Sequence, residues 1–220
     1  MRIITSIFTI AYVTALMIAG PATVESQMIS DVVFQRRLND ATAAAEKFSR
    51  RVTVVEETKM GDKLIGTNRT VEDFLPPGRQ RYLDITSSGG KSSTREIIQL
   101  GSVGYSKEDN GPWIEWTGSP WRPRLPKYLP PRFELEEART FTSFDEILNG
   151  QSVRVYVREE NRETNGISIW ERFAVWIAQD GLIYKSEFEN IEVISEKRVQ
   201  RTVAIWDYAP KGLSIERPIE

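Results

Sequence analysis

The sequence predicts a mixed α+β fold, in which a large, curled antiparallel sheet packs on one long N-terminal helix and short helices. Three observations predict it: an amphipathic segment near the N-terminus, about ten segments of alternating or β-branched residues, and very short turns between most of them. Short connections make consecutive strands antiparallel neighbours. A sheet of this size has to curl, close or split, and helices covering a curled sheet are the simplest layered arrangement.

The first 26 residues have the pattern of a secretory signal peptide. Arg2 is followed by an apolar run from Ile3 to Ala19 and then by small residues around Pro21. We expect cleavage after Ala22 or after Ser26, leaving a single domain over residues 27–220 without a stable membrane span. The alternative is a retained anchor, for which a run of about 17 residues is at the short limit. Cleavage predicts a periplasmic or secreted protein.

Apolar residues recur every three or four positions from Ile29 to Phe48, with Ser30 or Asp31 available as a cap. This spacing predicts one amphipathic helix that covers the sheet. Lys47, Arg50 and Arg51 at its end could meet an anionic headgroup, but stabilising the C-terminus of the helix is the simpler role.

The predicted strands share period-two alternation or β-branched and aromatic enrichment, and most are bounded by Gly, Asn or Asp turns. They cover residues 51–58, 64–73, 79–87, 93–100, 103–107, 113–116, 151–158, 167–178, 182–193 and 198–208.

A Pro- and Trp-rich crossover interrupts the strands at residues 111–131. Prolines exclude a central strand or a helix interior here, so we expect a long connection across an open end of the sheet. Residues 132–140 and 141–148 are predicted to form the two short helices, the second capped by Asn149-Gly150.

The amino-acid composition excludes more classes of function than any single motif does. The chain contains no cysteine and no histidine, which removes thiol nucleophiles, disulfides, thiolate or imidazole metal sites and a lipidated cysteine, so it is not expected to be a lipoprotein. With 29 basic and 31 acidic residues, the formal net charge of −2 gives no electrostatic case for nucleic acid. We therefore expect neither an enzyme nor a bound cofactor or metal.

Three stretches resemble the LolA/LppX-like periplasmic lipoprotein-carrier superfamily, together with the order of elements over most of residues 29–218. They are residues 78–83 (GRQRYL), residues 96–105 followed by Trp113, and residues 173–185 (FAVWIAQDGLIYK). The resemblance implies an unclosed β half-barrel packed on helices, with an apolar cavity for acyl chains. The expected partner is lipid or a lipid-modified cargo; no motif matches a protein-docking site.

If the concave side of the sheet is hollow, apolar side chains on its strands should line the cavity. The candidates are Val153, Val155, Phe173, Val175, Ile177 and Ile205. Trp113, Trp116 and Trp121 are candidates for a gate, because amphipathic rings suit the boundary between an apolar pocket and water. The alternatives are a solid core for the first set and loop packing for the second.

The leading hypothesis is thus a non-enzymatic carrier or sensor of lipids or acyl chains. One alternative is a cell-envelope scaffold or protein-binding module with a solid core. Another is a carboxylate-based hydrolase, whose acids would come from Glu134, Glu136 and Glu137 or from Glu159, Glu160 and Glu163.

Overall fold

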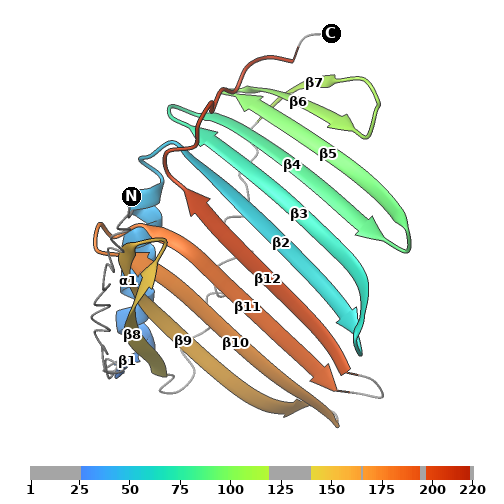
Figure 1. Cartoon of the computed structure of the whole chain (residues 1–220). Coiled ribbons are helices and arrows are strands. Elements are labelled where there is room, and N and C mark those ends of the chain that lie inside the picture. The colour runs from blue at the N-terminus through green and yellow to red at the C-terminus, as the bar shows by residue number, and fades with distance from the viewer. Residues whose placement is uncertain (1–25, 119–139, 165, 194–196, 219–220) are drawn as a thin grey trace, which may run out of the picture.

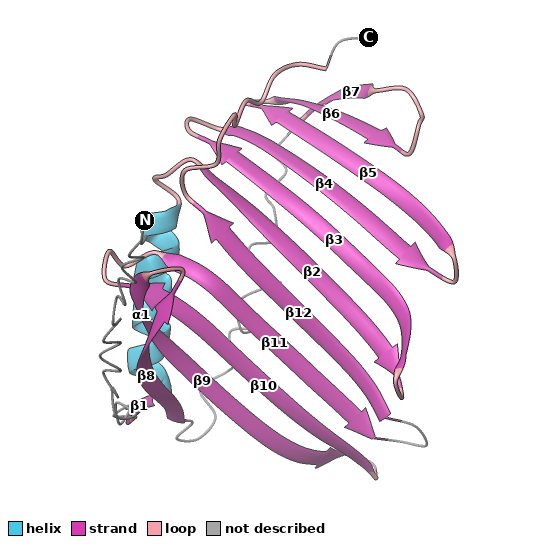
Figure 2. Ribbon diagram, in the orientation of Figure 1, coloured by secondary structure: helices cyan, strands magenta, loops and turns pink. Residues whose placement is uncertain are grey.

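The computed structural model describes residues 26–118, 140–164, 166–193 and 197–218. Within them the chain forms one antiparallel β layer, a curved sheet of twelve strands in the order β1-β8-β9-β10-β11-β12-β2-β3-β4-β5-β6-β7. One helix, α1 (Asp31–Ala45), lies against the β8–β9 side of the sheet (Figures 1 and 2). Strands β1 and β7 are the two edges of the sheet. The sheet does not close on itself, as expected of a large curled antiparallel sheet.

Two meanders meet at the centre of the sheet, where β12 pairs with β2 along ten residue pairs from Arg198↔Met60 to Asp207↔Arg51. The first meander contains β2 (Arg50–Met60), β3 (Lys63–Leu75), β4 (Arg79–Ser88), β5 (Lys91–Leu100), β6 (Val103–Glu108) and β7 (Ile114–Thr117). The second contains β8 (Thr140–Leu148), β9 (Gln151–Thr164), β10 (Ile167–Ala178), β11 (Ile183–Val193) and β12 (Lys197–Asp207), with β1 (Gln27–Ser30) added beside β8. All ten predicted strands are present, and β1 and β8 are additional.

The expected helix at residues 141–148 is wrong, because this segment is most of strand β8. Asn149 and Gly150 both have positive φ angles, 52° and 81°, and Leu148 pairs with Gln151 across them. This is the geometry of a two-residue hairpin turn, which Asn-Gly favours, rather than a helix cap. The other predicted short helix, residues 132–140, lies outside the described residues except for Thr140, which begins β8.

Helix α1 is shorter than predicted, since Ile29 belongs to β1 and the helix ends before Phe48. Its buried side is Asp31, Phe34, Leu38, Ala41 and Ala45, a stripe at three- and four-residue spacing. Its C-terminus is capped by Arg50, which is buried on β2 and donates a hydrogen bond to the Ala45 carbonyl (2.8 Å). The predicted role of this basic group as a helix-end stabiliser is confirmed for Arg50.

The two faces of the sheet bury different clusters. On the helix-facing face, side chains of α1 form one cluster with buried strand residues, which are Phe141, Tyr156, Phe173, Val175, Ile177, Ile183, Ala204, Trp206, Val52 and Val54. On the outer face, a second cluster combines Val153, Val155, Ala174, Trp176 and Ala178. Farther along the sheet, Leu213 and Ile215 of the C-terminal segment pack with Ile98 and Tyr105.

Glu72 is a partly buried acid on the helix-facing face of β3, opposite Val52 and Tyr82. Burial raises its pKa to about 7, while the positive charge of Arg50 acts in the opposite direction. The folded state therefore favours the protonated acid.

This gives a pH dependence with a definite sign. Because folding raises the pKa of Glu72, the free energy of unfolding is highest below pH 4.5 as far as this residue is concerned. It falls as pH rises toward 7, and Glu72 causes no further change at higher pH. Urea unfolding should show that Glu72→Gln gains roughly 1 to 3 kcal/mol relative to the native chain between pH 4.5 and pH 8. An equal difference between the two chains at both pH values would contradict this assignment.

Candidate functional site: a pocket between the helix and the sheet

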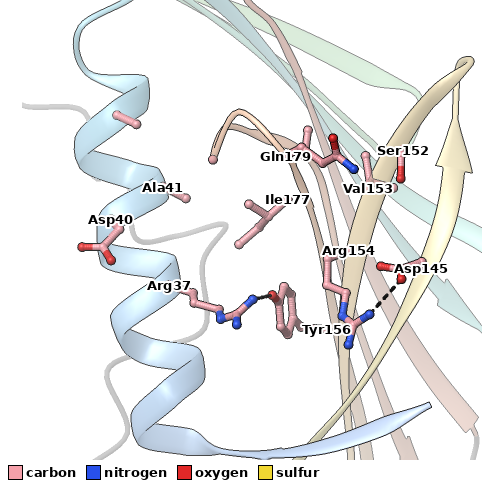
Figure 3. Close-up of a pocket in the computed structure, with 13 residues that line it drawn as sticks. Arg37, Asp40, Ala41, Asp145, Ser152, Val153, Arg154, Tyr156, Ile177 and Gln179 are labelled. Atoms are coloured by element: carbon pink, nitrogen blue, oxygen red, sulfur yellow. Dashed lines mark hydrogen bonds and ion pairs between the residues drawn. The ribbon is translucent and has the colours of Figure 1, made fainter. Parts of the chain in front are cut away.

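A pocket of about 700 Å³ lies between the C-terminal half of α1 and the ends of strands β8, β9 and β10 (Figure 3). The helix contributes one wall and the strands, with the β10–β11 turn, contribute the other. The lining residues are Arg37, Asp40, Ala41, Ala44, Asp145, Ser152, Val153, Arg154, Tyr156, Ile177, Ala178, Gln179 and Gly181.

The pocket exists because the two halves of α1 present side chains of different size to the sheet. In the first half, Phe34 is fully buried and stacks on Phe141 with ring centroids 3.9 Å apart. The rings of Tyr156 and Phe173 lie 5.7 and 6.1 Å from it. In the second half Ala41 and Ala44 line the pocket, and their methyl groups fill much less space than the Phe34 ring, although Ala41 is itself buried in the same core cluster.

One part of the pocket wall is apolar. Figure 3 shows Ala41 of the helix and Ile177 near the end of β10 on the two sides of the pocket, and Ala44 is also among the lining residues. Val153 and Ala178 border the pocket as well, although both belong to the outer-face cluster. Such a wall offers contact to hydrocarbon and no directional bond.

The remaining wall is polar, and its shortest hydrogen bond joins the helix to the sheet. Arg37 of α1 donates a hydrogen bond from Nη1 to the Tyr156 hydroxyl on β9 (2.5 Å), and its guanidinium lies 5.8 Å from the ring centroid of Tyr156. The second arginine, Arg154, donates to Asp145 Oδ2 (2.9 Å) and to Gln27 Oε1 (3.2 Å). Strand β1 is thereby tied to the rim of the pocket.

The described residues offer no evident catalytic or metal-binding constellation. No group of three or more acidic side chains that could hold a metal ion occurs among them. Of the acids singled out from the sequence, Glu159 pairs with Arg172 (3.4 Å) and Glu160 with Arg158 (3.6 Å), and consecutive residues of β9 point to opposite faces. Glu163 is exposed farther along the same strand, whereas Glu134, Glu136 and Glu137 lie outside the described part of the chain.

The six cavity candidates do not line one space. Val153 and Ile177 line the pocket, whereas Phe173 and Val175 are packed in the helix-facing cluster and Val155 in the outer-face cluster. Ile205 lies on the outer face of β12, opposite Thr53, and is 52% exposed.

The two described gate candidates, Trp113 and Trp116, lie at the opposite edge of the sheet, away from this pocket. Trp113 packs with the outer-face residues Tyr105 and Ile215, and Lys107 Nζ lies 5.0 Å from its ring centroid. Trp116 on β7 covers Gly104 of β6 so closely that a Cβ at this position would lie 2.1 Å from the indole ring. These contacts are those of packing residues, and Trp121 lies outside the described residues.

Sequence reasoning missed the polar members of the pocket, above all Arg37, Tyr156 and Arg154. One signal was available: Arg37, Ala41 and Ala44 follow each other at helical spacing, which places a charge and two small residues on one stripe. Their strand partners are more than 100 positions away in the sequence, and only the fold brings them together.

Solved structures with a similar arrangement include LprF from Mycobacterium bovis, with 11% identity, a TM-score of 0.42 and coverage of 87% of this chain and 99% of that chain. A LolA superfamily protein from Nitrosomonas europaea shows 12% identity and a TM-score of 0.27, with coverage of 79% and 90%. No protein-family model and no curated protein matches the chain. The second structure is named as a LolA superfamily protein, and this is the superfamily that the sequence resembles. At these identities and scores, function has to be inferred from the residues of this chain.

The size contrast along α1 predicts a large effect for one substitution. Phe34→Ala removes the ring that contacts Phe141, Tyr156 and Phe173, and should lower the free energy of unfolding by about 3–5 kcal/mol. Val33→Ala is the matched control, because Val33 is 42% exposed on the same helix, and should change it by less than about 1 kcal/mol. If urea unfolding shows that Phe34→Ala and Val33→Ala lower the free energy of unfolding equally, Phe34 does not hold the helix on the sheet.

Proposed function

We propose that this chain binds an amphiphilic molecule, with the hydrocarbon part lying in the pocket between α1 and strands β9 and β10, and acts as a non-enzymatic carrier or sensor of lipids or acyl chains. The observation that carries the proposal is a pocket of about 700 Å³ with an apolar wall and a polar wall. Ligand pockets in proteins typically measure about 300–1,000 Å³ and combine apolar lining with few polar groups.

The energetics of such a ligand need no polar motif. Each buried methylene contributes roughly 0.8 kcal/mol before the costs of association. A chain of eight methylenes against Ala41, Ala44 and Ile177 therefore supplies about 6 kcal/mol gross. The site is smaller than a cavity running along the whole sheet, because the Phe34 cluster fills the space at the other half of the helix.

The proposed location is the periplasm or the extracellular space, supported by the signal-like segment at residues 1–26. We propose that cleavage after Ala22 or Ser26 releases the domain beginning near β1. Among the described residues, no helix has the length and apolar character needed to cross a membrane.

A second candidate function is protein binding through the outer face of the central strands. Val55 on β2 is 37% exposed, and it lies opposite Val203 on β12, two residue pairs from the half-exposed Ile205. This apolar row favours the scaffold hypothesis, which requires no ligand in the pocket.

Blocking the pocket separates the two functions. Ala44 lines the pocket and Ala43 lies exposed beside it on α1, so Ala44→Trp should fill the space whereas Ala43→Trp should not. We expect Ala44→Trp to weaken binding of a fluorescent fatty acid at least tenfold and to remove lipid that co-purifies in native mass spectrometry. Ala43→Trp should bind as the native chain does.

Unchanged binding in Ala44→Trp would place the ligand elsewhere. A native chain that neither carries extractable lipid nor binds the fluorescent fatty acid would support the scaffold function.

A further inference from the structure

The cationic side chains of the pocket differ in whether an acid neutralises them. Arg154 is paired with Asp145 at 2.9 Å and also bonded to Gln27. Arg37, by contrast, forms no ion pair within 4.0 Å with any carboxylate of the described residues, and its hydrogen-bond partner there is the neutral hydroxyl of Tyr156. Arg37 is thus the pocket's available positive charge.

The remaining acid of the lining does not cancel this charge. Asp40 follows Arg37 by three residues on α1 but makes no ion pair with it, and Figure 3 shows its carboxylate on the side of the helix turned away from Ile177. Asp145 is held by Arg154 on the opposite wall. The five titratable groups that line the pocket therefore leave one cationic end, at Arg37 and Tyr156.

Tyr156 makes this end a preformed site. Its side chain is buried in the cluster with Phe34, which fixes the position of the hydroxyl. Because the hydroxyl oxygen accepts the hydrogen bond from Arg37, the hydroxyl proton is left to donate to a ligand. The remaining guanidinium N–H groups are donors in a planar fork that matches an oxyanion.

From this geometry we infer that the amphiphile carries an oxyanion headgroup, a carboxylate or a phosphate, bound by Arg37 and the Tyr156 hydroxyl while its hydrocarbon chain lies against Ala41, Ala44 and Ile177. The inference rests on the proposed function of the pocket and specifies its ligand class. Arg37 is exposed, so an anion from solvent can reach its guanidinium and form a charge-assisted pair there.

The test compares ligands that share one chain and differ in headgroup. Calorimetric titration with dodecanoate, dodecyl phosphate, dodecanol and dodecyltrimethylammonium, below their micellar concentrations, should show that at least one of the anions binds roughly 10- to 100-fold more tightly than the alcohol and that the cation binds most weakly. The two anionic arms distinguish a carboxylate from a phosphate headgroup.

Substitutions at the cationic end identify the side chain responsible. Arg37→Gln should reduce the preference for the anion over dodecanol to about twofold or less while the affinity for dodecanol stays within about twofold. Arg37→Lys, which keeps the charge, should retain most of the preference. Arg36→Gln is the matched control, because Arg36 is exposed on α1 outside the pocket lining.

The outcomes separate this inference from the function on which it rests. If dodecanol and both anions bind the native chain equally well, or if Arg37→Gln keeps the preference, the oxyanion assignment is overturned and the pocket proposal stands. If none of the four ligands binds the native chain, the proposed function itself fails.

Discussion

The stacking of Phe34 on Phe141, with Tyr156 and Phe173 around it, sets the position of the helix on the sheet. Buried aromatic rings contribute a large part of the packing energy of a core, and these four rings join the helix to the sheet. Once Phe34 fixes one half of α1, the space under the other half depends on what the next turns carry. Beyond the buried Leu38 the last turns carry Ala41 and Ala44, and these small side chains leave room for the pocket that they line.

The same contact links the apolar and polar parts of the site. Tyr156 touches Phe34 with its ring and Arg37 with its hydroxyl, so the core contact also orients the cationic end of the pocket. Strand β1 adds a second tie, because Gln27 bonds both Ser143 on β8 and Arg154 on β9. The rim is therefore assembled from segments distant in the sequence, and its geometry depends on the whole second meander.

Local patterning was enough to predict most of the strands. Alternation and Gly- or Asp-containing turns identify β10 at its full extent and most of β2, β4 and β12. The failure at β8 has a local cause: Asn149-Gly150 suits both a helix end and a hairpin turn, and pairing with β9 decides between them. Strand β1 was missed because four residues next to a helical pattern carry little periodicity of their own.

The site was less predictable than the fold, for a physical reason. On β9, Val153 and Val155 alternate with Arg154 and Tyr156, and the apolar set suggests the inner face. The helix instead covers the face of Tyr156, while Phe144 and Trp176 cover the valines. Along β10 the run from Phe173 to Ala178 is apolar on both faces, so alternation cannot assign either. The face of the sheet on which α1 packs is therefore set by tertiary contacts and not by the pattern within one strand.

Co-crystallisation of residues 27–220 with 12-bromododecanoate tests the central claim most directly, since anomalous scattering from bromine locates the hydrocarbon end of the ligand. We predict a bromine peak between α1 and β10, beside Ala44 and Ile177, with the carboxylate within hydrogen-bonding distance of Arg37. Bromine bound only on the outer face near Val55 and Ile205, with the space beneath Ala44 closed by neighbouring side chains, would contradict it.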